Sequence, residues 1–545
     1  MATSILSIGQ SALAAAQVGL STTGHNIANA ATPGYSRQVV VQGAAQPQNY
    51  GFGFMGQGTE ISTVKRIYSE FLGSQVRTTQ ATKSGLDSYY AQIKQVDNML
   101  ANPASGLSPA LQNFFSGVQE MSSNPSSIPA RQAALSSAES LAARFQSMAG
   151  RLDEIEQGVN SQITSGVNVI NSYAKQIAQL NDAIDRAQSA TGQPANDLLD
   201  QRDQLVLDLN KETRATVVKQ GDGGYNVFIG NGQPLVVGVS AFSLTTATSL
   251  TNPERIEVAY QTANGPVVIG ESSLGGGKLG GVLEFRSQTL EPAQNALGRV
   301  AIGLASSFNA QHQLGFDLNG DPGTAFFTVA APVVTASSGN NLTSTAAVGA
   351  TISDANALTT SDYRLAYDGS SYTLTRLSDN TTFNPITSGD TVDGVTISLS
   401  GAPAAGDSFL IRPTVNGASS FSVAITDPKL IAAAATSGAV GDNGNALLLG
   451  ALQTANTMNG GTTTYQGAYS QLVSQIGNKT RELEMTSSAA GNLLSEANLS
   501  LQSESGVNLD EEATNLLRYQ QAYQAAGKVM QIASEMFDVL LSLGR

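Results

Sequence analysis

The residues of this 545-residue chain that could carry chemistry are few, and their spacing fits no catalytic or metal site. His25 and His312 are the only histidines and cysteine is absent, which excludes thiolate ligands, cysteine nucleophiles and a His-Glu-x-x-His metallopeptidase helix. Gly51-x-Gly53-x-x-Gly56 has the spelling of a dinucleotide-binding turn, but no apolar strand precedes it and no good helical pattern follows it. We therefore expect a glycine-rich turn there, and two histidines with structural or surface roles.

A short acidic segment resembles the start of a calcium-binding loop. Its residues are Asp317-x-Asn319-x-Asp321, yet Pro322 follows them, and the twelfth position holds Thr328 instead of the glutamate found in such loops. We interpret the segment as turn chemistry. The sequence thus predicts no enzyme, no metal site and no cofactor.

The charge of the chain argues against two classes of partner. Its 28 basic and 42 acidic residues give a net charge of −14, which opposes attraction to phosphate backbones and to anionic lipid surfaces. No run reaches the ~18 apolar residues of a membrane span. The first basic residue is Arg37, whereas a secretory leader begins with basic residues. We therefore expect no nucleic-acid partner, no membrane insertion and no cleaved signal peptide.

Helical apolar stripes occur at both ends of the chain, with nothing local to bury them. At the N-terminal end the stripe repeats every seven residues, with small residues beside it. At the C-terminal end one helix carries two neighbouring rows with three- and four-residue steps, which make a wide apolar face. The N-terminal stripe consists of Leu6, Leu13, Leu20 and Ile27, the first C-terminal row of Leu516, Tyr519, Tyr523, Ala526, Met530, Ala533, Phe537 and Leu540, and the second row of Ala525, Val529, Ile532, Met536, Val539 and Leu543.

The first helix is expected to end near Ala30. Thr32 precedes Pro33 and is steered away from helical geometry, and Gly34 then permits a turn. An apolar helical face is most often the core of its own protein, but these stripes lie at the ends of a chain that can build a sizeable core elsewhere. We predict that both stripes, together with Asn29, Pro33 and Gly34, form an assembly interface with another copy or a neighbouring protein.

A long helical pattern dominates the first half of the chain. Between about Arg131 and Ala187, apolar residues follow a coiled-coil-like seam with one stutter. At 1.5 Å per residue this helix would be roughly 80 Å long, so the molecule should be elongated. Further helical patterns cover 282–328 and 426–502, and the latter begins with short helices near Lys429–Ala435 and Asn445–Leu452.

The middle of the chain changes from helical to strand patterns in two places. Short apolar runs separated by turns such as Asp222-Gly223-Gly224 and Asp393-Gly394 indicate hairpins. We predict a multidomain α+β fold, in which nested N- and C-terminal segments form an elongated helical bundle of coiled-coil type and β-rich domains are inserted. The expected domains are the terminal helices with an adjoining extended segment (1–67 and 503–545), the helical bundle (68–212, 282–328 and 426–502), a first β-rich domain (213–281) and a second, outer one (329–425).

Two sequence motifs link the ends of the chain to a known family. The first runs from Leu20 to Gln38 and reads LSTTGHNIANAATPGYSRQ. The second lies between Ser505 and Ala525, with SGVNLDEE at its start and LLRYQQAYQA at its end. Both resemble the signatures of the bacterial flagellar rod, hook and hook-associated axial proteins. The resemblance is weak over the second β-rich block.

This resemblance implies a structural subunit that joins the flagellar hook to the filament. It implies self-association in an axial ring whose inner layer is lined by terminal helices, and contacts with the hook protein and with the next hook-associated protein toward the filament. It also implies passage through the flagellar type III export apparatus, an export chaperone at the C-terminal helix, and a final place in the extracellular flagellum. Alone, the terminal helices bury too little apolar surface, so they should order on assembly.

The residues leave two alternatives open, which are another axial subunit of the rod or hook, and a secreted coiled-coil adhesin or scaffold. A rod or hook subunit would share the ends but lack the long central bundle, whereas an adhesin would not need the terminal stripes. In each case Asn508 or Asp510 is expected to cap the last helix, with Glu511 and Glu512 at its positive end.

Overall fold

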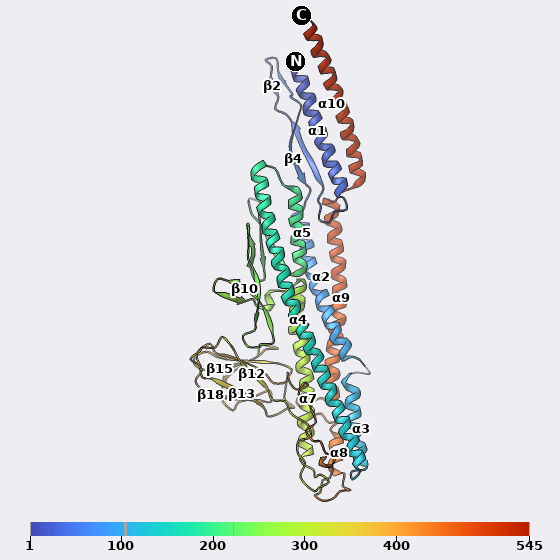
Figure 1. Ribbon diagram of the computed structural model, residues 1–545, viewed down its shortest axis with the longest axis vertical. Helices are drawn as coiled ribbons and strands as arrows, with labels where there is room; N and C mark the ends of the chain where they lie inside the picture. Colours follow the sequence, from blue (N-terminus) through green and yellow to red (C-terminus); the bar gives the residue numbers. More distant parts are fainter. Residues whose placement is uncertain (1, 103–105, 222, 544–545) are drawn as a thin grey trace.

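The protein is an elongated molecule with both chain termini at the same end, as the computed structural model shows (Figure 1). The structure describes residues 2–102, 106–221 and 223–543. At the end that holds the termini, α1 (Ala2–Asn29) and α10 (Leu509–Leu543) lie side by side, and we call them the terminal pair. The expected fold class is confirmed, because nested N- and C-terminal segments form a long helical body with inserted β-rich parts.

A bundle of long helices forms the body below the terminal pair. Its longest member, α4 (Ile128–Thr191), has 64 residues and is therefore about 95 Å long. It exceeds the predicted length because it begins directly after the N-cap Ser127 and ends only at the left-handed Gly192. The seam residues from Leu141 to Ile184 are buried, as predicted. The other helices are α2 (Glu70–Leu100), α3 (Leu107–Ser123), α5 (Asn196–Glu212), α6 (Gly277–Phe285), α7 (Glu291–His312), α8 (Gly444–Ala451) and α9 (Tyr465–Ser505).

The helix that returns through the bundle is less regular than its apolar period indicated. Between α6 and α7 it makes a π-helical turn, Arg286–Leu290 (η2). The side chain of Arg286 is fully buried there, donates to the carbonyl oxygen of Ile256 (2.7 Å) and pairs with Glu271. This turn depends on a partner from another part of the chain, which local periodicity does not reveal.

One predicted helix is wrong. Instead of a helix near Lys429–Ala435, the chain forms a single 3₁₀ turn, Pro428–Leu430 (η3), followed by an extended segment. Ala434 of this segment exchanges backbone hydrogen bonds with Phe316 (2.8 and 3.2 Å), which takes its amide and carbonyl away from any helix. The neighbouring short helix is present as α8.

A long hairpin accompanies the terminal pair. In it β1 (Gln38–Ala44) pairs with β4 (Thr59–Arg66), and further out β2 (Gln48–Asn49) pairs with β3 (Phe54–Met55), both antiparallel. The glycine-rich segment that imitates a dinucleotide-binding turn forms the tip and the outer part of this structure. We call residues 38–66 the terminal hairpin.

The two β-rich blocks consist of antiparallel sheets that project from the side of the bundle (Figure 1). Strand order is β5-β6-β7-β8 and β11-β10-β9 in the first block, and β12-β19-β14-β15-β16 and β13-β18-β17 in the second. Asp393 and Gly394 both have positive φ in the turn between β17 and β18, as an Asp-Gly hairpin requires. The strands are β5 (Ala215–Lys219), β6 (Tyr225–Ile229), β7 (Gln233–Val237), β8 (Ser240–Ala241), β9 (Leu244–Thr248), β10 (Ile256–Thr262), β11 (Gly265–Val268), β12 (Val333–Ala336), β13 (Ala347–Ile352), β14 (Tyr363–Tyr367), β15 (Tyr372–Arg376), β16 (Thr382–Ile386), β17 (Thr391–Val392), β18 (Val395–Ser400) and β19 (Ser408–Arg412).

The two β-rich blocks differ in how they are stabilised. Buried residues of the first block, such as Tyr225 and Val258, belong to one apolar core with the helices of the bundle. The second block has a core of its own, built around Leu365, Phe409 and Ile411. The first block is therefore packed onto the bundle, while the second has its own core and meets α7 through a small buried cluster of Ile302, Leu358 and Val395. The exact domain boundaries remain a prediction.

The remaining candidates for chemistry are accounted for by local structure. The carboxylate of Asp317 accepts the backbone N–H groups of Asn319 (2.7 Å) and Asp321 (2.9 Å), which is the geometry of an Asx turn. His25 is half-buried on α1, with its Nε2 3.3 Å from a carboxylate oxygen of Asp197. No helix in the described part of the chain is long and apolar enough to cross a membrane.

His312 is a fully buried residue at the end of α7. Its Nε2 accepts the N–H of Ala432 (2.9 Å), and its Nδ1–H donates to the carbonyl oxygen of Thr324 (2.7 Å). A proton on Nε2 would face the Ala432 N–H, so this geometry suits only the neutral ring. Burial lowers the pKa of His312 from 6.5 to about 4, with Arg131 adding to the effect.

The free energy of unfolding should therefore fall as the pH decreases from 6.5 to 4, because over this range the unfolded chain binds a proton at this histidine and the folded chain does not. Over this range the lowered pKa of His312 reduces the free energy of unfolding by about 3 kcal/mol in total. His312→Gln removes the titrating group, so we expect the free energy of unfolding of this variant to fall by about 3 kcal/mol less between pH 6.5 and pH 4. Urea denaturation at each pH measures this difference. Equal slopes for the two proteins would contradict the assignment. Because carboxylates also titrate near pH 4, only the difference between the proteins is informative.

Candidate functional site at the joint of the terminal pair

The two terminal helices touch through small residues. A Cβ added at Gly9 would lie 2.9 Å from Sδ of Met530, and one at Gly19 only 2.5 Å from the ring of Tyr519. Ala526 and Ala533 of α10 are buried in the same contact. The backbones thus approach closely because α1 lacks side chains at these positions.

The predicted N-terminal stripe is not the face that α1 uses against α10. Leu6 and Ile27 are exposed, and Leu13 and Leu20 are only half-buried. The face covered by α10 is the row of small residues beside the stripe. The stripe therefore stays largely open along the terminal pair, and its role as an assembly interface remains a prediction.

On α10, the first predicted row is divided between the contact and the surface. Ala533 is buried and Tyr519 and Met530 are half-buried, whereas Leu516, Tyr523 and Phe537 are exposed. The second row is largely exposed: Val529 lies at the edge of the contact with Gly9 of α1, and Ile532, Met536 and Val539 are exposed beyond it. We call these four residues the outward row. The side chains of Leu540 and Leu543 lie outside the described residues.

Where the terminal pair meets the bundle, Asn26 organises the chain that leaves α1. Its Nδ2 donates to the carbonyl oxygen of Gln38 (2.9 Å), and its Oδ1 accepts the N–H of Gln38 (2.9 Å) and the hydroxyl of Tyr35 (2.7 Å). Burial raises the pKa of Tyr35, and Asp197, Asp200 and Glu512 raise it further, so the phenol keeps its proton and remains a donor. One amide side chain thereby fixes the connecting loop 30–37 against α1.

Arg37 ties the same loop to the start of α10. Its guanidinium donates to Glu512 (2.8 Å), which is buried, and to Glu511 (2.7 Å), which is exposed. Its backbone N–H donates to the carbonyl oxygen of Ser505 at the end of α9 (2.8 Å). Of the two expected caps of α10 it is Asn508 that acts, because its Oδ1 accepts the N–H of Asp510 (3.0 Å).

A group of buried charges fixes the loop and the terminal hairpin to α5. Arg66 of β4 pairs with both Asp200 and Asp203 (2.7 Å each), and Asp200 also accepts the N–H of Ser36 (2.9 Å). Burial raises the pKa of Asp200, although Ser36 and Arg66 oppose the rise. Burial alone would lower the pKa of Arg66, but the two carboxylates outweigh it and raise that pKa. This cluster thus ties three chain segments together.

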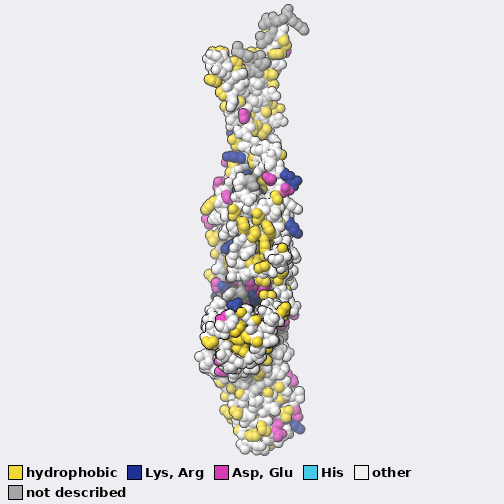
Figure 2. Space-filling model, turned by 90° about the vertical axis from the view of Figure 1, so that its left-hand side faces the viewer, with side chains coloured by type: hydrophobic (Ala, Val, Ile, Leu, Met, Phe, Trp, Pro, Cys, Tyr) yellow, Lys and Arg dark blue, Asp and Glu magenta, His cyan; other side chains and the backbone are white. Residues whose placement is uncertain are grey.

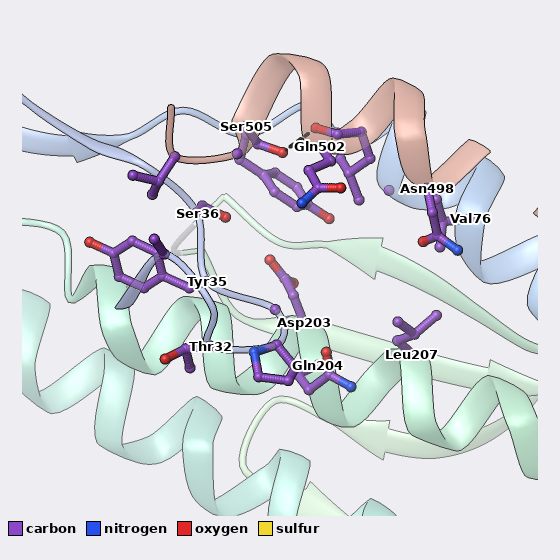
Figure 3. Close-up of a pocket in the computed structure, with 18 of the residues that line it drawn as sticks. Thr32, Tyr35, Ser36, Val76, Asp203, Gln204, Leu207, Asn498, Gln502 and Ser505 are labelled. Carbon is purple, nitrogen blue, oxygen red and sulfur yellow. Dashed lines mark hydrogen bonds between the residues drawn. The ribbon is translucent and has the colours of Figure 1, made fainter. Parts of the chain in front are cut away.

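Beside the loop lies a pocket of about 350 Å³, shown in Figure 3. Loop, α2, α5 and α9 all contribute to its wall. Gly34 has a φ of +77° there, and a Cβ on it would lie 2.7 Å from Oε1 of Gln204. The side chains labelled in Figure 3 are Thr32, Tyr35, Ser36, Val76, Asp203, Gln204, Leu207, Asn498, Gln502 and Ser505.

The structure thus separates the predicted site residues into two groups. Asn29, Pro33 and Gly34 lie at the joint, where Asn29 donates to the carbonyl oxygen of His25 (3.0 Å), while the apolar rows lie along the terminal pair. Sequence reasoning missed the pairing of Arg37 with Glu512. A signal was present, since Arg37 is the first charged side chain of the chain and stands within the N-terminal motif.

Four family models match this chain. The helical domain of the flagellar hook-associated protein FlgK matches residues 93–327, and the D2-like domain of flagellar hook-associated protein 1 matches residues 336–413. The model for flagellar basal body rod proteins matches residues 6–35, and the C-terminal model of the FlgEFG rod proteins matches residues 501–543. The ends are thus common to axial proteins, whereas the central matches are specific to hook-associated proteins.

Full-length relatives agree with these models. Flagellar hook-associated protein 1 of Escherichia coli (strain K12) is 39% identical over 99% of this chain and 100% of its own length. The protein of the same name from Salmonella typhimurium is 40% identical over the same shares, and that from Bacillus subtilis (strain 168) is 24% identical over 98% of this chain and 97% of its own. The solved flagellar hook junction protein FlgK from Burkholderia pseudomallei has a TM-score of 0.74 at 32% identity, and the match covers 79% of this chain and 99% of that one.

Paired terminal helices on a long bundle, with outer β-rich blocks, define this chain as a structural subunit of the flagellar axis. Identity near 40% over the full length places it more narrowly: the chain belongs to the flagellar hook-associated protein 1 family.

Proposed function

We propose that this chain forms the ring that joins the flagellar hook to the filament, and that its copies associate through the terminal pair. One side of the ring contacts the hook protein, and the other contacts the next hook-associated protein toward the filament. The relatives it matches are named as structural flagellar proteins, and the proposed role is structural as well.

The observation that carries the proposal is the outward row of α10. These four apolar side chains begin with Val529, at the edge of the contact with α1, and continue along an exposed face of the helix through Ile532, Met536 and Val539. A contiguous exposed apolar surface of this kind is typical of a protein interaction site. This surface lies on the terminal pair, where both motifs of the axial family are found, so the expected binding partner is another axial subunit.

Before assembly, a different protein must bind the same apolar surface to keep it from associating prematurely. We propose that the chain travels through the flagellar export apparatus to an extracellular position in the flagellum, and that an export chaperone covers α10 until then. The exposed apolar rows support this, since they would favour premature association in the cell.

A chain that ends at Asn508 tests the proposal. It lacks α10, so it should retain a folded bundle but be incorporated at less than about one hundredth of the full-length level, since the row that contacts the neighbours is gone. Electron microscopy of a strain without its own copy should then show hooks that lack filaments. Normal filaments on this truncated chain would contradict the proposed function.

A further inference from the structure

The tip of the terminal hairpin carries aromatic side chains that nothing in the described part of the chain covers. Phe52 is 82% exposed and Phe54 73% exposed, and Tyr50 stacks on Phe52 at a ring distance of 6.2 Å. Large apolar side chains grouped at the end of a projecting hairpin mark a contact surface for another protein. Figure 2 looks at the side of the terminal pair that carries this hairpin, and apolar side chains are visible near its upper end.

The hairpin is fixed on α1 at Gly58 and Thr59, just before the tip begins, so the position of the tip relative to α1 is defined. A Cβ on Gly58 would lie 2.2 Å from Oγ of Ser11 and 3.2 Å from the backbone of Ile8, and Ser11 Oγ also accepts the N–H of Thr59 (3.2 Å). The hairpin is therefore packed tightly onto the first turns of α1, and the exposed tip extends beyond this contact.

The level of the tip along the molecule follows from the geometry of strands and helices. Gln38, which contacts Asn26, pairs with Arg66 of β4, and Thr59 at the other end of β4 contacts Ser11. Between Arg66 and Thr59 the strand advances about 23 Å at 3.3 Å per residue, which matches the rise of α1 from Asn26 to Ser11. The hairpin thus runs parallel to α1. The residues beyond Gly58 add about 20 Å, which brings Phe52 and Phe54 level with the last turns of α10.

The same level holds the outward row. Gly9, one residue from Ile8, packs against Val529 and Met530, so Gly58 of the hairpin is level with the start of that row. Ile532, Met536 and Val539 follow toward the end of the molecule. Within one chain the two surfaces do not meet, because the hairpin lies on the other side of α1 from α10 (Figure 1).

We propose that the hairpin tip of one copy docks on the outward row of α10 of a second copy. The two surfaces differ and lie on different sides of the terminal pair, which makes the contact heterologous, and a heterologous contact that closes generates a ring. Phenyl rings against methionine and branched aliphatic side chains form a well-matched apolar contact. This inference deepens the proposed function and rests on it.

The first test removes the aromatic rings. Phe52→Ser with Phe54→Ser should leave the melting temperature unchanged, because both rings are exposed, yet lower incorporation into flagella at least tenfold. Leu342→Ser, at a fully exposed leucine of the second β-rich block, is the matched control and should be incorporated normally. Normal incorporation of the double variant would overturn the inference. If the chain that ends at Asn508 fails to assemble while this variant succeeds, only the hairpin contact is refuted and the proposed function stands.

The second test identifies the partner, and it is straightforward because the chain contains no cysteine. Two single-cysteine chains, Phe54→Cys and Val539→Cys, are expressed together, and their flagella are treated with a mild oxidant. A dimer-sized product should appear for the mixture but for neither chain alone, and it should be absent when Ser534→Cys, on another face of α10, replaces Val539→Cys. A product from Phe54→Cys alone, a product with a different flagellar protein, or no product would each overturn the docking on a second copy.

Discussion

Two carboxylates on the outward row of α10, introduced as Ile532→Asp with Val539→Asp, are expected to abolish incorporation into the flagellum without changing the fold. Ile532 is 54% exposed and Val539 57% exposed, so in the separate chain both new carboxylates remain in water. In the assembled ring they would be buried without a partner, which costs several kcal/mol for each charge. A loss of more than a hundredfold in the incorporated protein should follow.

The control for this experiment lies on the same helix. Gln524→Asp with Gln531→Asp adds the same charge on the polar side of α10, where both glutamines are exposed, and should be incorporated within a fewfold of the unmodified chain. Incorporation is measured as the amount of subunit in purified flagella, and melting curves of the free proteins show whether the fold is unchanged. If the two pairs of substitutions behaved alike, the outward row would not be an interface.

The helical body of this protein could be predicted from the sequence because its signals are local. The seam from Leu141 to Ile184 is a period within one helix, and the Asp393-Gly394 turn is a property of two adjacent residues. Neither needs a distant partner. The π-helical turn at Arg286 does, since its charge is paired with Glu271, and it was not predicted.

The terminal helices were predicted from the sequence, but the arrangement of their faces was not. Apolar periodicity found the rows at both ends, yet it did not indicate which face of α1 would be covered. That choice depends on how closely two backbones can approach, and the glycines at positions 9 and 19 allow the approach on the small-residue side. The small residues beside the stripe are visible in the sequence, but apolar periodicity predicts the stripe of large residues as the contact face. The joint was missed because Arg37 and Glu512 lie at opposite ends of the chain.

The joint explains why the N-terminal motif extends past the first helix into residues that are held largely by hydrogen bonds and ion pairs. An interface that transmits force from one axial segment to the next needs a fixed angle between the terminal pair and the bundle. Asn26, Arg37 and Asp200 each hold the connecting loop to a different element, namely α1, α10 and α5. In the proposed ring, these three attachments would set the direction in which the outward row faces its partner, so that joint and interface would act as one unit.

The strongest test of the joint removes its buried cation. Arg66→Met leaves Asp200 and Asp203, both largely buried, without their common partner, and breaking a buried ion pair from one side costs about 3–5 kcal/mol. We expect local opening of β4 and α5 to become easier by that amount, as measured by amide hydrogen exchange. Exchange in the middle of α4 should stay unchanged. Lys65→Met, at the exposed neighbouring residue, is the matched control and should have little effect.

The pH dependence of this variant distinguishes a lost charge from lost packing. Burial raises the pKa of Asp200 and Arg66 is among the groups that oppose the rise, so removing the guanidinium raises this pKa further. A carboxyl group with a raised folded pKa destabilises the protein above that pKa and ceases to do so as the pH falls through it. The Arg66→Met variant should thus regain part of its lost protection as the pH is lowered from 7 to about 4, the ordinary carboxyl pKa, and Asp203→Asn added to it should restore part at pH 7. A deficit that is the same at both pH values would show that Arg66 acts through packing alone, and that the joint is not held by charge.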